Sequence, residues 1–211
     1  MTLRPRHPRR GGLVAAPLLL ALLAAPAAAR DCAVTAREGA PARIWSDGEW
    51  RDLELGPLPA GSQVIATGPA ARLEITCDDG VTVTVGFGAE VTLETLVGPS
   101  DRAGSVVLQL LRGIVGVVAP RRTWESFEVR APLAIASARS TEWLAEHAEA
   151  TGSTVFVREG RVAVRPARGA AVTLEAGEGV TQPPEGPAAP VLRWGPPRVA
   201  GAAAALGFGW R

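Results

Sequence analysis

Apolar and polar residues alternate through several short runs between residues 105 and 165. Phe127 and Val129 alternate with charged residues in one run, and Val162 and Val164 do so in another. A period of two places successive side chains on opposite faces of an extended chain, so each run predicts a half-buried strand. We therefore predict an all-β fold in which short strands form a solenoid-like or sandwich arrangement within a single domain.

Turn residues separate these runs. Glu159-Gly160 connects the last two runs, and glycine readily adopts the positive φ that so tight a connection requires. Asp78-Asp79-Gly80 predicts a second turn, because Asp and Gly tolerate left-handed conformations. Ser46-Asp47-Gly48, between two tryptophans, predicts a short hairpin near the N-terminus.

The first 29 residues are typical of a secretory signal peptide. Four arginines and no acidic residue precede an apolar run from Leu13 to Ala25, and three alanines at 27–29 suit a cleavage site. The run is shorter than the ~20 apolar residues that a membrane span needs. We therefore expect a periplasmic or secreted protein without a membrane span after cleavage. Retention of the segment as an anchor is the alternative.

Cys32 and Cys77 are the only cysteines. An oxidising compartment favours a disulfide between them, which would close a loop of about 45 residues and stabilise the fold by about 4 kcal/mol. Lipidation of Cys32 is disfavoured because Arg30 and Asp31 precede it, where small or aliphatic residues would be needed. Two separately buried thiols are the remaining alternative.

The charge of the mature chain argues against nucleic-acid binding. Removal of residues 1–29 takes away four of 22 basic residues and none of 21 acidic ones, which leaves 18 against 21 and a net charge of −3. A general nucleic-acid binder needs a basic face. We therefore expect no nucleic-acid partner.

Residues 105–118 are apolar on both faces of the expected strand. Val106 and Leu108 lie on one face, whereas Val107 lies on the other. Strands of this kind are usually covered on both faces. One interpretation is burial under the N-terminal segment or the C-terminal tail. The other is a partner-binding face, with Val107, Leu111, Ile114 and Val118 as its candidate residues.

Residues 140–150 are locally ambiguous. Helix propensity is good and Ser140 is a suitable N-cap, which favours a helix. The neighbouring period-two runs favour a strand instead, and we predict a strand.

Few residues are available for catalysis. His147 is the only histidine after signal cleavage, and no G-x-S-x-G turn occurs. We place His147 on the surface of a strand and predict a protein that is not an enzyme. The less favoured alternative is a small envelope hydrolase that uses Glu142, His147 and a nearby serine.

Metal ligands are equally few. Four Cys or His ligands for zinc cannot be gathered. Asp78-Asp79 lacks the spacing of a calcium loop, and so does the set of Glu142, Glu146 and Glu149. We therefore expect no metal and no cofactor.

Six prolines fall within residues 182–198, and proline cannot donate to a sheet ladder. We expect an extended tail there. The Ala- and Gly-rich residues 199–210 are too few to cross a bilayer, and three states stay open for them: docking on the domain, docking on a partner, or disorder. The predicted organisation is a signal peptide at 1–29, an N-terminal segment with a hairpin at 30–60, a β domain at 61–181 and a Pro/Gly/Ala-rich tail at 182–211.

An ordered series of motifs extends from about Gly61 to Val180. The series comprises Val64-x-x-Thr67-Gly68, Leu73-x-Ile75, Asp79-Gly80, Leu111-Arg112-Gly113, Phe127-x-Val129-x-Ala131-Pro132, Ser140-Thr141-Glu142-Trp143, Glu159-Gly160-x-Val162-x-Val164 and Leu174-x-Ala176-Gly177-Glu178. This order resembles the FecR-like domain, the periplasmic sensor module of iron-uptake regulators. The family usually has Thr-Pro in place of Ala131-Pro132, and Gly-Thr-Glu-Phe in place of Ser140 to Trp143.

The resemblance implies an all-β module and supports the strand at residues 140–147. The residues that match the family motifs are Arg112, Gly113, Thr141, Glu142, Trp143, Glu159 and Gly160. Family members that regulate sigma factors carry a cytoplasmic helical domain and a membrane helix before this module, whereas here the signal peptide leads almost directly to it.

Together these features predict a non-enzymatic periplasmic binding or sensor module. Its expected partner is an unidentified envelope protein or small ligand, and the resemblance raises a role in iron-uptake signalling. The alternative from another class is a structural envelope protein that assembles with copies of itself.

Overall fold

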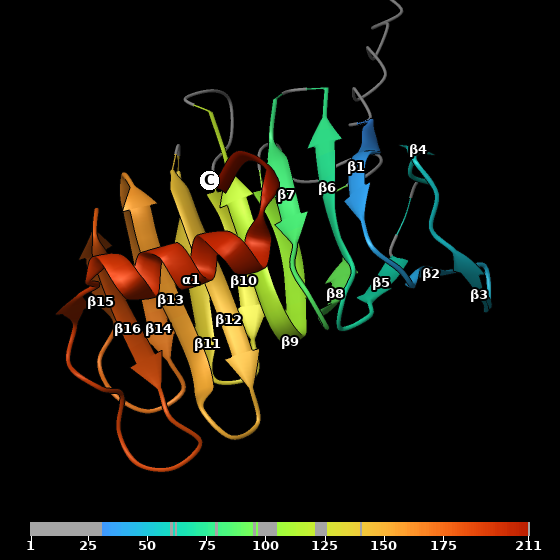
Figure 1. Cartoon of the computed structure of the whole chain (residues 1–211). Helices are drawn as coiled ribbons and strands as arrows, with labels where there is room; N and C mark the ends of the chain where they lie inside the picture. The colour runs from blue at the N-terminus through green and yellow to red at the C-terminus, as the bar shows by residue number, and fades with distance from the viewer. Residues whose placement is uncertain are drawn as a thin grey trace, which may run out of the picture.

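A computed structural model describes residues 31–59, 61, 63–78, 80–94, 96, 105–120, 126–139 and 141–210. The predicted signal peptide lies outside the described residues. The described residues form strands in two facing layers, with one α-helix near the C-terminus (Figure 1). The predicted all-β fold is confirmed, and the arrangement is sandwich-like.

Each layer is a row of short strands that share one long strand, β9 (Ser105–Val118). The first layer contains, in order, β4 (Gly56–Pro57), β1 (Cys32–Glu38), β6 (Arg72–Cys77), β7 (Thr82–Val85), the end of β9, β12 (Glu142–Ala148), β13 (Gly152–Glu159), β16 (Glu178–Gln182) and β17 (Leu192–Arg193). The second layer contains β3 (Glu49–Asp52), β2 (Ala42–Ser46), β5 (Gln63–Thr67), β8 (Glu90–Leu93), the start of β9, β10 (Ser126–Ala131), β11 (Ala134–Ala138), β14 (Arg161–Pro166) and β15 (Val172–Glu175).

The chain passes repeatedly from one layer to the other. Gly160, with φ +89°, turns the chain from β13 in the first layer to β14 in the second. The tight connection predicted at Glu159-Gly160 therefore joins the two layers, and these two strands pair with other neighbours. Strands of the N-terminal segment belong to the same layers, since β1 pairs with β6 and β2 with β5.

The main core lies between the layers and is built from the alternate apolar residues of both. Val83 and Val91 represent the two sides, and each is fully buried. Trp143 on β12 fills part of the same core. The strand predicted for residues 140–150 is confirmed as β12, which pairs with β9 on one side and β13 on the other. The tertiary pairing thus overrides the local helix propensity.

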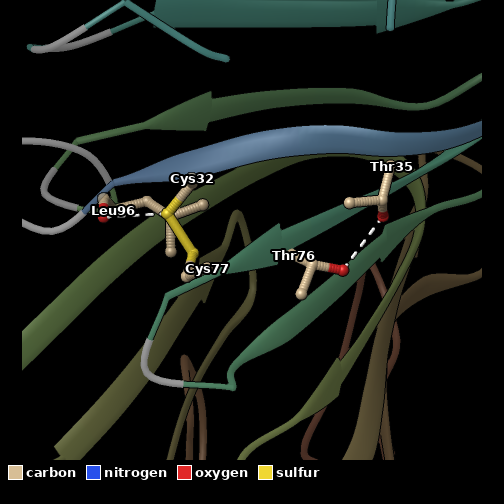
Figure 2. Close-up of a disulfide and its surroundings, with 5 residues drawn as sticks. All are labelled: Cys32, Thr35, Thr76, Cys77 and Leu96. Atoms are coloured by element: carbon tan, nitrogen blue, oxygen red, sulfur yellow. Dashed lines mark hydrogen bonds between the residues drawn. A yellow bond between two sulfur atoms is a disulfide. The ribbon is translucent and has the colours of Figure 1, made fainter. Parts of the chain in front are cut away.

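A disulfide joins β1 to β6. Cys32 and Cys77 are direct cross-strand partners, and their sulfurs are bonded (Figure 2). On the same two strands, the hydroxyls of Thr35 and Thr76 lie 2.9 Å apart in a hydrogen bond. The predicted bridge is confirmed, and it fastens β1 to its neighbour β6 in the first layer.

The extended tail predicted for residues 182–198 ends before Pro196, and of the three states left open for residues 199–210, docking on the domain is the one observed. Pro196–Leu206 form helix α1, followed by a short 3-10 helix, η1 (Phe208–Trp210). Proline is tolerated in the first turn of a helix because those N–H groups have no intrahelical acceptor. Helix α1 lies across the outer face of the first layer (Figure 1). No helix in the described ranges is long and apolar enough to span a membrane.

Arg72 on β6 fastens the end of this helix. Its guanidinium donates a hydrogen bond to the Ala204 carbonyl at 2.5 Å and forms an ion pair with Glu38. The same group lies 4.9 Å from the ring centre of Phe87 and 5.6 Å from that of Phe208. Cation–π contacts of this kind add to the ion pair, so one side chain ties the helix C-terminus to the sheet.

Candidate binding surface at the bend of β9

Strand β9 changes layers at Gly113. Before this point it pairs with β8 in the second layer, and after it with β7 and β12 in the first. Gly113 has φ +86°, and a Cβ at this position would lie 2.5 Å from the Ala89 Cα. Only glycine combines this backbone conformation with so close an approach. The Arg112-Gly113 motif therefore marks the bend.

The bend explains why β9 is apolar on both faces. Leu108 and Leu110 point into the core before Gly113, and Val115 and Val117 point into it afterwards. The core-facing residues thus change from even to odd numbers across the bend. The opposite face carries the four residues that were candidates for a partner-binding face.

Those four residues have different surroundings. Leu111 is exposed, with 43% of its surface accessible, whereas Val107 and Val118 are half-buried. Ile114 is only 6% exposed, because α1 covers it from outside. Of the four, Leu111 is the side chain most open to a partner.

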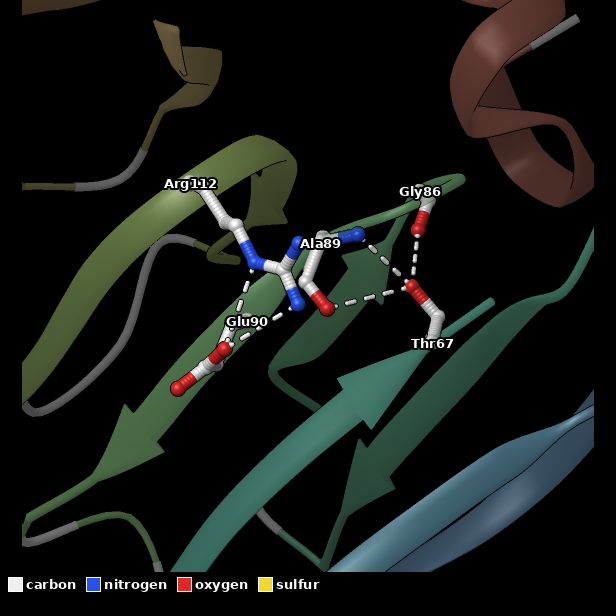
Figure 3. Close-up of polar contacts among 5 residues, drawn as sticks. All are labelled: Thr67, Gly86, Ala89, Glu90 and Arg112. Atoms are coloured by element: carbon white, nitrogen blue, oxygen red, sulfur yellow. Dashed lines mark hydrogen bonds and ion pairs between the residues drawn. The ribbon is translucent and has the colours of Figure 1, made fainter. Parts of the chain in front are cut away.

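Polar contacts hold the neighbouring strands in place around the bend (Figure 3). Arg112 pairs with Glu90 at 3.2 Å. The Thr67 hydroxyl donates to the Gly86 carbonyl at 2.7 Å and accepts from the Ala89 amide at 2.9 Å. Thr67 therefore fixes the turn into which Gly113 packs.

Two clefts flank Arg112, and Arg112 and Gly88 line both of them. The larger has a volume of about 630 Å³, and its lining residues are Gly88, Leu111, Arg112, Gly113, Glu146, His147, Ala148 and Glu149. The smaller, of about 290 Å³, is lined by Pro41, Arg43, Ala66, Thr67, Gly68, Pro69, Gly88 and Arg112. We call the surface formed by Leu111, Arg112 and these two clefts the bend surface. It combines an exposed apolar side chain with charges of both signs.

His147 lies at the edge of the larger cleft, with 9% of its surface exposed. Its position on a strand agrees with prediction, but the predicted surface exposure is wrong. The imidazole Nδ1 lies 2.9 Å from the Ser153 hydroxyl oxygen, which accepts a hydrogen bond from the Leu133 amide at 3.1 Å. Burial lowers the pKa of His147, and the Gly152 backbone and Glu149 oppose the shift in part.

This His-Ser pair differs from a nucleophile with its base. The Ser153 side chain is buried, with 1% of its surface exposed, and its oxygen already accepts from a backbone amide. An attacking hydroxyl must reach its substrate. The pair therefore holds β12 against β13, and Ser153 gives no support to the hydrolase alternative.

The motif residues other than Arg112 and Gly113 lie on or next to β12 and β13. Glu142 forms an ion pair with Arg158 at 2.8 Å. Burial raises the pKa of the Glu142 carboxyl and Glu159 adds to the shift, while Arg158 opposes it. Thr141 is buried beside the core residue Trp143. Glu142 and Trp143 are about 30 positions from Arg112 in sequence, and β12 places both next to β9.

Metal ligands do not converge in the part of the chain that the structure describes. No group of three or more His, Cys, Asp and Glu side chains is placed to hold an ion there. Asp79 of the turn at 78–80 lies outside the described residues.

Sequence reasoning missed Glu90 and Thr67 as partners of the bend. Neither residue has a spacing that links it to Arg112, because the contacts arise from strand pairing between β5, β8 and β9. The positive φ of Gly113 was equally hidden within an apolar run.

The order of these elements agrees with one known family. A family model described as FecR protein matches residues 63–163, which include the bend and the Glu142–Arg158 pair. Residues 63–163 form a FecR domain. The match begins at β5 and ends within β14. In sequence, β1 to β4 precede the matched region and α1 follows it.

Solved structures share the fold of the FecR domain. Two crystal structures of a candidate anti-sigma factor from Parabacteroides distasonis ATCC 8503, at 2.50 Å and 1.65 Å, superpose with TM-scores of 0.52 and 0.51. Sequence identity is 17% and 18%, over 62% and 61% of this chain and 58% and 57% of theirs. The chain thus spans less than two thirds of those proteins, and likeness at this identity concerns the fold. No curated protein matches the chain.

Proposed function

We propose that this protein is a non-enzymatic binding or sensor module of the cell envelope that contacts another envelope protein through the bend surface. The FecR domain and the structural likeness to a candidate anti-sigma factor support a regulatory module of this kind. The family resemblance makes iron-uptake signalling the first system in which to look for the partner.

The location in the envelope rests on two features. The basic and apolar character of residues 1–29 is that of a secretory signal. The Cys32–Cys77 disulfide is stable in an oxidising compartment and uncommon in the cytosol. Both features favour the periplasm or the exterior.

The observation that carries the proposal is the exposed Leu111, which lines the larger cleft beside Arg112. A few residues near the centre of an interface supply most of its binding energy, and Arg is one of the enriched types. Arg112 is of that type, Leu111 adds an exposed apolar side chain beside it, and Gly113 and Thr67 hold the backbone beneath them in a fixed position. A rigid surface loses little entropy when it binds.

The test compares Leu111→Glu with Leu55→Glu. Leu55 is 61% exposed and belongs to the connection between β3 and β4, away from the two clefts. Purified protein without its signal segment is used to capture partners from solubilised envelope. We expect wild type and Leu55→Glu to retain the same proteins, and Leu111→Glu to lose them by about tenfold or more.

A thermal melt of each variant serves as the folding control. Both leucines are exposed, so neither substitution should move the midpoint appreciably. Equal capture by Leu111→Glu and wild type would exclude the bend surface as the contact. Loss of capture by both variants would indicate a non-specific apolar contact instead.

A further inference from the structure

The outer face of the first layer carries a row of paired residues beneath α1. Gly116 on β9 pairs with Leu144 on β12, Leu144 pairs with Phe156 on β13, and Phe156 pairs with Gly179 on β16. Because cross-strand partners point to the same face, two large apolar residues lie in the middle of the row. A glycine stands at each end.

Each glycine makes room for a tryptophan. A Cβ on Gly116 would overlap the indole of Trp210, and a Cβ on Gly179 would overlap that of Trp194. Trp194 also stacks on Phe156, with 4.2 Å between ring centres and 17° between planes. The two indoles are thus set into the sheet at opposite ends of the row and form the walls of a cleft.

Helix α1 forms the roof of this cleft with small side chains. Val199, Ala200 and Ala203 line it from the helix, and the short alanine side chains leave space above the sheet unfilled. The remaining volume is about 480 Å³, over a floor of Leu144 and Phe156. Small-molecule sites in proteins usually have volumes of ~300 to 1,000 Å³ and mostly apolar linings, so the cleft has the size and character of such a site.

The arginines around the cleft indicate the charge of the ligand it would bind. Arg158 lines the cleft, lies 5.8 Å from the ring centre of Trp210, and is bonded to Glu142 at 2.8 Å. Arg198 on α1 lies 4.0 Å from the ring centre of Trp194. A cation therefore stands at each tryptophan. This disfavours a cationic ligand and favours an anionic head group on an apolar body.

We propose that the cleft between α1 and the sheet binds a small anionic amphiphile, with its alkyl chain on Leu144 and Phe156 and its carboxylate at Arg158. The ligand carboxylate competes with Glu142 for the same guanidinium. The site is separate from the bend surface.

The test is calorimetric titration with decanoate, decan-1-ol and decylamine, all below the concentrations at which they form micelles. These probes share one chain length and differ in head group. We expect wild type to bind decanoate about tenfold more tightly than decylamine, with decanol between them. Equal binding of decylamine and decanoate would overturn the charge argument, and no binding of any probe up to about 1 mM would overturn the site itself.

Variants assign the binding to this cleft. Ala200 and Ala204 are both exposed on α1, but only Ala200 lines the cleft. Ala200→Trp should fill the cleft and weaken decanoate binding by about tenfold or more, and Ala204→Trp should leave it unchanged. If Ala200→Trp binds as wild type does, the probe adsorbs elsewhere and the proposal fails.

The ion pair provides the second readout. Arg158→Gln should weaken decanoate binding and leave decanol unaffected, because decanol has no charge to lose. Glu142→Gln should strengthen decanoate binding by removing the competing carboxylate. Unchanged decanoate affinity in both variants would contradict the assigned position of the head group. Both substitutions lie away from Leu111, so capture of an envelope protein remains a separate measurement.

Discussion

Gly113 is the residue on which the shape of the bend depends. Its φ of +86° disfavours any side chain, and the Ala89 backbone occupies the space where a Cβ would lie. Leu111 and Arg112 come immediately before it, so a shift here would displace the proposed contact residues together.

Gly113→Ala should therefore destabilise the protein in two ways: the positive φ is unfavourable for alanine, and the new Cβ would overlap the Ala89 backbone. Gly48 is a matched control, since it has φ +87° and no atom within 4 Å of the Cβ position. Gly48→Ala should lower the free energy of unfolding by about 1 kcal/mol through conformation alone. Gly113→Ala should lower it by about 1–3 kcal/mol more through overlap.

Denaturant unfolding of the two variants measures this difference directly. Equal losses of stability would show that the Ala89 backbone moves aside at little cost, and the rigid bend would then have no physical basis.

His147 is the second residue with a measurable consequence. Its pKa in the folded protein lies below the ordinary value of 6.5 because of burial. The unfolded chain therefore takes up a proton first as pH falls. The stability that neutral His147 provides is complete above pH 6.5 and is lost as pH falls through the lower, folded value.

We expect the free energy of unfolding of wild type to fall between about pH 7.5 and pH 5.5 more than that of His147→Asn. Asparagine can still form a hydrogen bond with Ser153 but does not titrate. Glu142, whose raised pKa acts in the opposite direction, is present in both proteins and cancels in the comparison. Parallel pH profiles would contradict the role assigned to burial of His147.

Among the elements, the strands could be predicted from the sequence, but the layer to which each strand belongs could not. The period-two pattern predicted the strands at Phe127, Val129, Val162 and Val164, and it favoured a strand over a helix at residues 142–148. Local alternation shows that a strand has a buried face. It does not show which neighbour pairs with it, and the change of layer at Gly113 therefore remained hidden.

Helix α1 was the element that sequence reasoning missed. The prolines pointed to an extended tail up to residue 198, and the small residues of 199–210 left docking and disorder open. Pro196 and Pro197 instead form the first turn of a helix. The position of α1 also explains why Ile114 is buried, since the helix covers this side chain. For the same reason the cleft beneath α1 had no signal in local sequence.

The docking of α1 rests on few side chains and can be removed selectively. Leu206 is fully buried against Ile114 and its neighbours, in a cluster separate from the main core. Leu206→Ala should therefore release the helix while the two layers stay folded, since truncation of a buried leucine costs about 2–5 kcal/mol.

Hydrogen exchange distinguishes local release from global unfolding. Amides of residues 199–207 should lose protection in Leu206→Ala, and those of β12 in the middle of the first layer should keep it. Loss of protection in both regions would show that the helix is part of the cooperative core.

For the whole molecule, the layers end in short strands. The first layer ends at β4 and β17, each of two residues, and the second at β3 and β15, each of four. Edge strands that are short and charged resist pairing with other chains. Three of the four residues of β3 are charged, which argues against assembly of copies through this edge.

We therefore expect the protein without its signal segment to sediment as a monomer over a roughly tenfold range of concentration. A sedimentation coefficient that rises with concentration would favour the structural, self-assembling alternative.

The central claim is that the bend surface contacts an envelope protein. A photo-crosslinking amino acid at position 111 in intact cells tests it directly, with position 55 as the exposed control. We predict one discrete adduct at 111 and none of the same size at 55. The same adducts at both positions, or none at 111, would contradict it.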